Sequence, residues 1–389
     1  MPVGGIGSDG FFNAPTPNFS LAPLVPVDGG ASVGLTLTAV VCSNDGSHAV
    51  ALGPDNGTGD LRAVYSSDGG FTWTVAGGFP IVPGATQVAG NGQQAMAMHG
   101  TTVVAAVLVS SNLHIITSTD GGANWTDTTP ATATCSCFPI YSLTAGGQFI
   151  WFDGTNNVVW SAADGSTWVS NPLPAAINRA QNLENPAGTA LISYVSLASD
   201  NHAEIWASSD GITWVSRLVI STTTSTPGYI PFVFNSARHE FAATFLHDID
   251  NGYDFYTSNP LGTVWTLRST GTQPPPDAVP AVFKHFYYVG TESFGYYLSA
   301  DGVAWTPEPV ANPLFLNNFW QLSGTGSLLM QYGPNVSATP DGINFGPLLV
   351  FTTPTGNVST MAGTAAGGGY TLAVGTDDSG VGHIWRFGA

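Results

Sequence analysis

The sequence has very few positive charges. Its 389 residues contain 7 Lys and Arg against 25 Asp and Glu, which gives a formal net charge of −18. Seven scattered cations cannot cover a phosphate backbone, and this excludes a nucleic-acid-binding protein. An anionic membrane surface is excluded as a partner for the same reason.

Long apolar stretches are also missing. The longest purely apolar run, Val103–Val109, is far shorter than the ~20 residues of a transmembrane helix. The first residues, MPVGGIG, show neither the basic region nor the apolar core of a signal peptide, so we expect no leader and no membrane insertion. With 43% hydrophobic and 11% aromatic residues, the chain can still bury a large core, which argues against disorder.

Cysteine is scarce and predicts no structural role. The three cysteines are an odd number and form no disulfide framework. A bridge between Cys135 and Cys137 would be strained, and Cys42 stands alone. No nearby His or Cys completes a metal site around them, so we expect quiet thiols.

Helical patterns are nearly absent. Residues Ala175–Asn185 are the best candidate for a short helix or turn. Elsewhere, short runs rich in Val, Ile, Thr and aromatic residues alternate with clusters of Gly, Asn, Asp and Ser, which indicates strands and turns. The 48 Gly and 27 Pro agree with a turn-rich, all-β chain.

One turn sequence recurs along the chain. Five copies are well preserved: Ser66–Trp73, Ser118–Trp125, Ser161–Trp168, Ser208–Trp214 and Ser299–Trp305. Two are degenerate: Ser258–Trp265 and Pro340–Phe345. The closing aromatic residues are 40 to 52 residues apart, with a mean of about 45. Such a period in an all-β chain predicts a β-propeller with one four-stranded blade per repeat.

The repeat resembles the Asp box, or BNR repeat, of sialidase-type propellers. Its pattern is S-x-D-x-G-x-x-W, and the first two copies match every fixed position. The Asp carboxylate is expected to accept backbone N–H groups across the turn, Gly to supply a positive φ, and Trp to pack into the neighbouring sheet. We therefore predict purely structural roles for Asp68, Trp73, Asp120, Trp125, Asp164, Trp168, Asp210, Trp214, Asp301, Trp305 and Asp341.

The count of strand-like runs predicts eight blades. After the seventh box, three runs remain, near Asn357–Gly363, Tyr370–Gly375 and His383–Phe387. The N-terminal sequence Ser8–Phe12 looks like a box remnant. We expect residues 1–34 to form an arm that adds the missing strand to the last blade, while residues 35–389 form the propeller. Seven blades is the alternative if the arm lies elsewhere.

The catalytic residues of sialidases are not recognisable in this chain. The family holds its substrate carboxylate with three arginines and carries an F-R-I-P-like motif, which is absent here. Arg62 and Arg386 fall in third-strand runs, and Arg217 and Arg268 directly follow boxes, so all four look peripheral. Other Asp-box propellers hydrolyse glucans with two carboxylates ~5–10 Å apart. If this chain did so, Glu184 and Glu240 would be the candidates.

Two further features are candidate binding sites. Asp248, Asp250 and Asp254 place oxygen ligands at alternate positions around a glycine, so calcium is a possible cofactor and no other is expected. Asp55–Asp60 occupies the same place in the first repeat, which makes a polar hairpin turn the simpler interpretation. Trp320 lies among amide side chains and could stack on a sugar. The tryptophans at 151, 160, 206 and 385 are expected in the core.

Two classes of function remain open. The first is a non-enzymatic, virion-associated structural or attachment protein of a bacteriophage, such as a tail-fibre, spike or capsid-decoration component. It would bind other virion proteins, a host glycan or a host protein on the virion surface. The low Lys content and the abundance of Gly, Thr, Asn and Ser favour this reading. The alternative is a secreted, extracellular glycoside hydrolase of Asp-box type. A scaffold of a photosynthetic or sorting complex would fit the repeat, but its partners usually need charged faces. The acidic surface favours neutral sugars or protein surfaces as ligands.

Overall fold

The computed structural model describes most of the chain from Leu35 onward. The described residues are 35–79, 84–88, 95–110, 112–133, 140–143, 147–185, 187–197, 203–220, 232–246, 253–271, 280–283, 286–291, 295–308, 318–322, 327–332, 335–339, 349–350, 358–379 and 381–387. The arm predicted at residues 1–34 lies outside them, as does Asp341.

The described residues form eight antiparallel sheets, numbered here in chain order. The first contains β1 (Ala39–Cys42), β2 (Ala49–Pro54), β3 (Leu61–Ser66) and β4 (Thr74–Val75). The second contains β5 (Ala85–Val88), β6 (Met96–His99), β7 (Thr102–Val109), β8 (Asn112–Ser118) and β9 (Thr126–Asp127). The third contains β10 (Tyr141–Ser142), β11 (Phe149–Asp153), β12 (Val158–Ala162) and β13 (Val169–Pro172). The fourth contains β14 (Ile177–Glu184), β15 (Leu191–Leu197), β16 (Ala203–Ser208) and β17 (Val215–Ile220).

The remaining four sheets have the same antiparallel strand order. The fifth contains β18 (Phe232–Asn235), β19 (Glu240–Leu246), β20 (Tyr253–Ser258) and β21 (Trp265–Gly271). The sixth contains β22 (Pro280–Phe283), β23 (Phe286–Thr291), β24 (Gly295–Ser299) and β25 (Thr306–Glu308). The seventh contains β26 (Asn318–Leu322), β27 (Ser327–Tyr332), β28 (Asn335–Thr339) and β29 (Leu349–Val350). The eighth contains β30 (Val358–Gly367), β31 (Tyr370–Asp377) and β32 (Gly382–Phe387), with no fourth strand among the described residues.

The expected strands are present, but the expected helix is not. Residues 177–184, predicted as a short helix or turn, form β14 and pair with β15 over its full length. Ile177 and Ala180 are buried between the third and fourth sheets. The prediction was wrong because partners distant in sequence decide the conformation of a short, weakly patterned segment.

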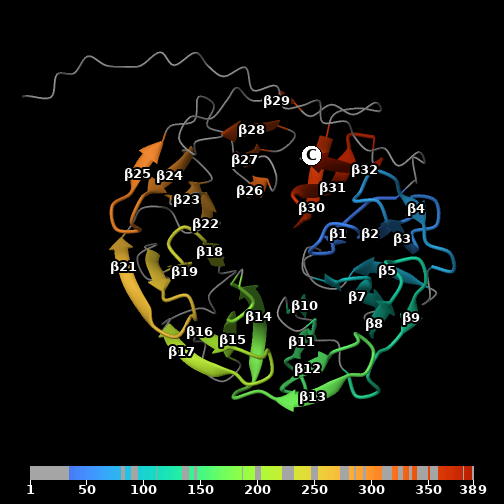
Figure 1. The fold of residues 1–389 in the computed structure, drawn as a ribbon, viewed down its shortest axis with the longest axis horizontal. Helices are drawn as coiled ribbons and strands as arrows, with labels where there is room; N and C mark the ends of the chain where they lie inside the picture. Colours follow the sequence, from blue (N-terminus) through green and yellow to red (C-terminus); the bar gives the residue numbers. More distant parts are fainter. Residues whose placement is uncertain are drawn as a thin grey trace, which may run out of the picture.

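The sheets follow one another around a common centre (Figure 1). The first strand of each sheet lies toward the centre, and the last strand lies at the perimeter (Figure 1). Innermost strands of neighbouring sheets are in contact, as β1 is with β6, β14 with β18, and β18 with β22. Strand β1 also contacts β30, so the eighth sheet lies against the first.

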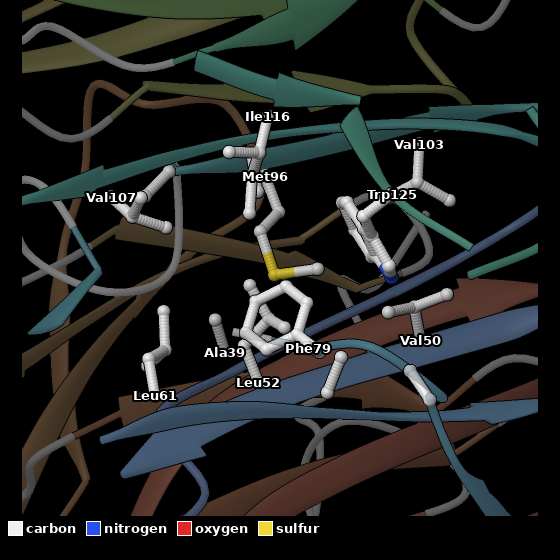
Figure 2. Packing of buried hydrophobic residues seen from close by; sticks show 14 of the residues in the cluster. Ala39, Val50, Leu52, Leu61, Phe79, Met96, Val103, Val107, Ile116 and Trp125 are labelled. Atoms are coloured by element: carbon white, nitrogen blue, oxygen red, sulfur yellow. The ribbon is translucent and has the colours of Figure 1, made fainter. Parts of the chain in front are cut away.

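The hydrophobic core is divided among the spaces between consecutive sheets. Figure 2 shows the cluster between the first and second sheets, where Leu52 and Val50 face Met96, Val103 and Trp125. An equivalent cluster joins the first sheet to the eighth and contains Leu35, Leu37, Leu372 and Val374. Each sheet is therefore stabilised by its two neighbours.

Candidate functional site

The box turns are held by hydrogen bonds within a few residues. In the first box, the Ser66 hydroxyl donates to the Asp68 carboxylate at 2.7 Å and accepts the Gly70 N–H at 2.8 Å. The N–H groups of Phe71 and Thr72 donate to Asp68 Oδ1 at 3.0 and 2.9 Å. The indole N–H of Trp73 donates to the carbonyl of Gly70 at 3.2 Å, which closes the turn.

These contacts favour the ionised form of the box aspartates. Burial opposes ionisation of Asp68, but the hydrogen bonds from Thr72, Ser66 and Phe71 outweigh it and hold the pKa of the carboxyl below its ordinary value. The pKa values of the box carboxyls Asp120, Asp164, Asp210 and Asp301 are lowered by equivalent donors. The carboxylates of these aspartates therefore accept hydrogen bonds from the N–H and O–H groups of their own turns.

One copy that looks degenerate in sequence keeps part of the box hydrogen bonding, although the Ser258 hydroxyl donates to the backbone carbonyl of Asn259 and not to its side chain. Asn259 takes the place of the box aspartate in the fifth sheet. Its Oδ1 accepts the Thr263 N–H at 2.8 Å, its Nδ2 donates to the Thr263 hydroxyl at 2.8 Å, and Trp265 Nε1 donates to the Gly262 carbonyl at 3.0 Å. An amide can thus replace the carboxylate in this turn.

Each box also touches the sheet that precedes it. A Cβ on Gly122 would lie 2.5 Å from Val50 Cγ2, and one on Gly165 would lie 2.8 Å from Val104 Cγ2. The six tryptophans belong to the clusters shared with the preceding sheet: Trp73, Trp125, Trp168, Trp214, Trp265 and Trp305. The box is therefore a packing device between sheets.

The first box meets the eighth sheet in the same manner. A Cβ on Gly70 would lie 2.9 Å from Leu372 Cδ2. The Arg386 guanidinium lies 4.0 Å from the centre of the Phe71 ring and 4.4 Å from that of Tyr370. Its Nε–H donates to the carbonyl of Gly69 at 2.9 Å. Arg386 lies on β32, the third strand of the eighth sheet, as the sequence predicted.

Glu240 lies in a polar cluster between the fifth and sixth sheets. The hydroxyl of Tyr287, a fully buried residue of β23, donates to Glu240 Oε1. Arg238 Nη1 lies 3.7 Å from Oε1, and Arg268 Nη2 lies 3.8 Å from Oε2. Burial, followed by the contact with Glu240, raises the pKa of Tyr287 and keeps the phenol neutral. Glu240 is thus engaged by three side chains from two sheets.

Both candidate carboxylates lie toward the box turns. Arg238, two residues before Glu240, donates a hydrogen bond to the carbonyl of Ala300, which belongs to the box of the sixth sheet. Glu184 is buried at the end of β14, and the following Asn185 donates from Nδ2 to the Pro260 carbonyl in the box turn of the fifth sheet. The two glutamates therefore lie on the box side of the molecule.

Sequence reasoning missed the partners of Glu240. Arg268 was expected at the periphery, and Tyr287 and Arg238 were not singled out. No local pattern could reveal them, because Tyr287 is 47 residues from Glu240 and reaches it only through the packing of adjacent sheets.

The hairpins between second and third strands lie at the opposite side from the boxes. Three of them are organised by an aspartate at the end of the second strand. Asp55 Oδ1 accepts the Gly57 N–H at 2.8 Å, which confirms the predicted hairpin turn. Asp153 Oδ1 accepts the Asn156 N–H at 3.1 Å, and Asp377 Oδ1 accepts the Ser379 N–H at 2.9 Å.

The third strand supplies a partner to each of these aspartates. Arg62 Nε lies 3.9 Å from Asp55, and Trp160 Nε1 lies 3.4 Å from Asp153. His383 Nε2 lies 3.1 Å from Asp377, and both side chains are buried. The carboxylates of Asp153 and Asp377 are buried, and that of Asp55 is half-buried. The exposed side chains on these turns and on the β7–β8 turn are one carboxylate, Asp378, and seven amides and hydroxyls: Asn56, Thr58, Ser110, Asn112, Thr155, Asn156 and Ser379.

The remaining sequence candidates are only partly described. Asp248 and Asp250 of the possible calcium loop lie outside the described residues, while Asp254 Oδ2 accepts a hydrogen bond of 3.4 Å from the Tyr256 hydroxyl. The side chain of Trp320 lies outside the described part. The other four tryptophans are buried as expected: Trp151, Trp160, Trp206 and Trp385. Burial raises the pKa of Cys42 to about 12, in agreement with a quiet thiol.

The described part of the chain contains neither a metal-binding cluster nor a membrane-spanning helix. Among the described residues, no three His, Cys, Asp or Glu side chains are grouped so that they could hold a metal ion. None of the described segments forms a helix that is long and apolar enough to cross a membrane.

No protein-family model matches the chain, and no curated protein matches its sequence. Solved structures do resemble it. BBS1N, in complex with ARL6DN, is 11% identical with a TM-score of 0.50, and the match covers 79% of this chain and 94% of that one. YCF48 bound to a D1 peptide is 13% identical with a TM-score of 0.47, covering 77% and 90%. The GH74 xyloglucanase from Xanthomonas campestris is 13% identical with a TM-score of 0.48, covering 88% of this chain but 57% of the enzyme.

These neighbours are β-propeller proteins. The likeness to BBS1N, together with the four-stranded antiparallel sheets around a common centre, establishes an all-β, propeller-type fold. At 11% identity, the likeness concerns the fold alone.

Proposed function

We propose that the chain is an Asp-box propeller of eight blades whose N-terminal arm, residues 1–34, completes the last blade. Eight sheets are present among the described residues, and the eighth has three strands there. Gly70 and Trp73 contact the eighth sheet as the other boxes contact the sheets before them. The described chain begins at Leu35, whose carbonyl oxygen lies against Gly382 of β32. An arm leaving from this point starts beside the sheet that lacks a strand.

We further propose that this propeller is a non-enzymatic structural or attachment protein of a bacteriophage virion. The observation that carries the non-enzymatic part of the proposal is the engagement of Glu240 by Tyr287, Arg238 and Arg268; the virion assignment rests on the low Lys content and the abundance of Gly, Thr, Asn and Ser. A hydrolytic pair needs two carboxylates that face a substrate from opposite sides of the bond to be cleaved. Glu240 instead neutralises two arginines between sheets, and Glu184 is buried at a strand end. Neither arrangement leaves a carboxylate turned toward a ligand.

The side opposite the boxes is the proposed binding side. Its described hairpins expose mainly amide and hydroxyl groups together with one carboxylate, Asp378, while Asp153 and Asp377 are buried and Asp55 is half-buried. Amides and hydroxyls bind neutral sugars or peptide backbones without requiring a charged partner. The net charge of −18 disfavours anionic glycans such as sialic acid and sulfated sugars. The expected ligand is therefore a neutral host glycan or a protein surface.

The location of the chain tests the proposal directly. Particles and cleared supernatant from the source culture are separated on a density gradient, and the chain is quantified in both by mass spectrometry. A fixed ratio to a capsid or tail protein across the particle peak supports the proposal. Recovery of the chain only as free protein in the supernatant contradicts it.

A second measurement separates binding from hydrolysis. The purified chain is incubated with a panel of neutral glucans, and reducing ends and bound sugar are measured together. Binding without release of reducing ends, unchanged in Glu184→Gln and Glu240→Gln, supports the non-enzymatic role. Release that is lost in either variant establishes the glycoside hydrolase instead.

A further inference from the structure

The turn between β2 and β3 contains an asparagine followed by a glycine, Asn56 and Gly57. In such a pair the backbone nitrogen of the second residue can attack Cγ of the asparagine side chain and close a five-membered ring. Glycine favours this reaction because it has no Cβ to obstruct the ring. Asn56, Gly57 and Thr58 are exposed, so water reaches this turn. The other two Asn-Gly pairs of the sequence, at residues 91–92 and 251–252, lie outside the described residues.

A carboxylate already contacts the N–H group that must lose its proton in this reaction. The Gly57 N–H donates to Asp55 Oδ1 at 2.8 Å, and the Thr58 N–H donates to the same oxygen at 3.2 Å. Arg62 Nε lies 3.9 Å from the other carboxylate oxygen, Oδ2. A carboxylate that accepts a hydrogen bond from a reacting N–H group can take up its proton as a general base. Asp55 is therefore placed to make the nitrogen of Gly57 nucleophilic.

A hydroxyl from another segment is bound to the oxygen on which negative charge develops. Thr36 Oγ1 donates to Asn56 Oδ1 at 2.8 Å, although the two residues are 20 positions apart. The Thr36 N–H donates to the Pro54 carbonyl at 2.9 Å, which fixes Thr36 beside the end of β2. Attack on Cγ turns the amide oxygen into an oxyanion, and a hydrogen-bond donor that is already in place stabilises it.

We propose that Asn56 is a site of spontaneous covalent modification, which the fold promotes through Asp55 and Thr36. The nitrogen of Gly57 forms a bond to Cγ of Asn56 while its proton passes to Asp55. The bond between Cγ and the side-chain nitrogen then breaks, that nitrogen takes up the proton, and ammonia leaves behind a cyclic imide. Water opens the imide at either carbonyl, which gives aspartate or its isomer isoaspartate at position 56. No oxidant or reductant is needed.

The modification changes the side of the molecule opposite the boxes. It replaces an exposed amide with a carboxylate and adds one negative charge to the net charge of −18. The reaction depends only on the described turn, whereas its effect on a ligand rests on the binding side proposed above. A ligand that accepts a hydrogen bond from the Asn56 amide is expected to bind the modified chain more weakly, because a carboxylate cannot donate one.

Peptide mapping of the aged full chain tests the proposal. The protein is incubated folded and in concentrated urea, in water enriched in heavy oxygen, and the peptide that contains Asn56 is analysed by mass spectrometry. The label separates conversion during incubation from conversion during digestion. Conversion is expected to be at least about threefold faster in the folded chain than in urea, where Thr36 no longer reaches the amide. The rate in the folded chain should also rise less steeply with pH, because Asp55 replaces hydroxide as the base.

Two pairs of variants assign the effect to its residues. Thr36→Val removes the hydroxyl and keeps the branched shape, and Thr38→Val is the matched control, because the Thr38 hydroxyl donates to a carbonyl of β2 instead. Asp55→Asn is compared with Asp60→Asn, which removes a carboxylate of the same turn and changes the net charge equally. Loss of such a donor in an enzyme costs ~10²–10³ in rate, and on an exposed turn a smaller loss of about threefold to tenfold is expected in Thr36→Val and Asp55→Asn.

The folded chain and the chain in urea share the wild-type sequence, so their comparison holds even if a variant fails to fold. Slower conversion of Asn56 in the folded chain overturns the proposal and means that the bonds to Thr36 and Asp55 protect the amide. Equal rates in the two states overturn it as well, because the turn then reacts only as its local sequence dictates. Equal losses in the variants and their controls, or no loss in either, remove the roles of Thr36 and Asp55.

Discussion

The hydroxyl of Tyr287 donates a hydrogen bond to the carboxylate of Glu240 across the boundary between the fifth and sixth sheets. Tyr287 is fully buried, and Arg238 and Arg268 lie within 4 Å of the same carboxylate. A buried carboxylate is costly unless donors and cations surround it, so the four side chains form one interdependent unit. This unit fixes the relative position of two sheets.

The first prediction concerns this hydrogen bond. Tyr287→Phe is expected to lower the free energy of unfolding by ~1–3 kcal/mol, because it leaves a largely buried carboxylate one donor short. Urea denaturation followed by tryptophan fluorescence measures the loss. Tyr256→Phe is the control, since its hydroxyl makes a longer contact of 3.4 Å with Asp254. Equal losses in the two variants would contradict the role assigned to Tyr287.

The second prediction uses the asparagine box as a guide. Asn259 makes the contacts of a box aspartate through its amide, including a 2.8 Å bond from Nδ2 to Thr263. Asp68→Asn is therefore expected to cost less than half as much unfolding free energy as Asp68→Ala, which should cost ~1–2 kcal/mol by leaving turn N–H groups unpaired. Chemical denaturation of the two variants and the wild type gives the ratio. A similar loss in both would mean that the negative charge, and not the hydrogen-bond geometry, holds the turn.

How much could be predicted from sequence depends on the range of the interactions. The box turns and the strands around them were predictable, because Ser66, Asp68 and Gly70 contact one another within five residues. The same local chemistry explains the hairpin at Asp55. The strand at Ile177–Glu184 was missed because its conformation depends on pairing with β15. The Glu240 cluster could not be predicted from the sequence because it joins residues from two sheets. The role of Asn259 could not be predicted either, because the sequence does not show that an amide can replace the carboxylate in the turn.

The third prediction is the response to acid. The pKa values of Asp68, Asp120, Asp210 and Asp301 lie below the ordinary value of 3.8 in the folded chain. A lowered folded pKa contributes stability that is fully present above the unfolded pKa and is lost as the pH falls through the folded pKa. The contribution of these groups should be constant above about pH 5 and fall below about pH 4.

Denaturation midpoints at a series of pH values check this response. The double variant Asp68→Asn with Asp210→Asn is expected to be less stable at neutral pH but to lose stability less steeply below pH ~4, because two of the titrating groups are gone. The double variant carries two fewer negative charges at neutral pH, so the comparison uses the steepness of the loss below pH ~4 and not the neutral-pH midpoints. Parallel curves for the two proteins would show that the boxes do not contribute to the acid response.

The fourth prediction separates backbone conformation from packing at a box glycine. Gly122 has a φ of 98°, and a Cβ there would lie 2.5 Å from Val50 Cγ2. Gly78 also has a positive φ, 71°, but a Cβ on it meets no atom within 4 Å. Both alanine variants carry the cost of a positive φ, ~1–2 kcal/mol. Gly122→Ala should cost ~1–3 kcal/mol more, because β-branched Val50 cannot turn aside easily. Thermal and urea unfolding measure both, and equal losses would remove the packing role of the box glycine.

The fifth prediction concerns the contact between the eighth sheet and the first. Arg386 lies near the rings of both Phe71 and Tyr370 and donates to the Gly69 carbonyl. Arg386→Lys keeps the charge but loses the planar group that stacks on the rings and the Nε–H donor, so it should lose most of the stabilisation lost in Arg386→Ala, ~1–2 kcal/mol. Hydrogen exchange locates the effect: amides of β30–β32 and β1 are expected to exchange faster in both variants, while β14–β17, on the other side of the molecule, remain as protected as in the wild type (Figure 1). If the lysine variant behaves like the wild type, or if exchange rises uniformly around the molecule, Arg386 does not hold this boundary and the eighth sheet is joined to the first by apolar packing alone.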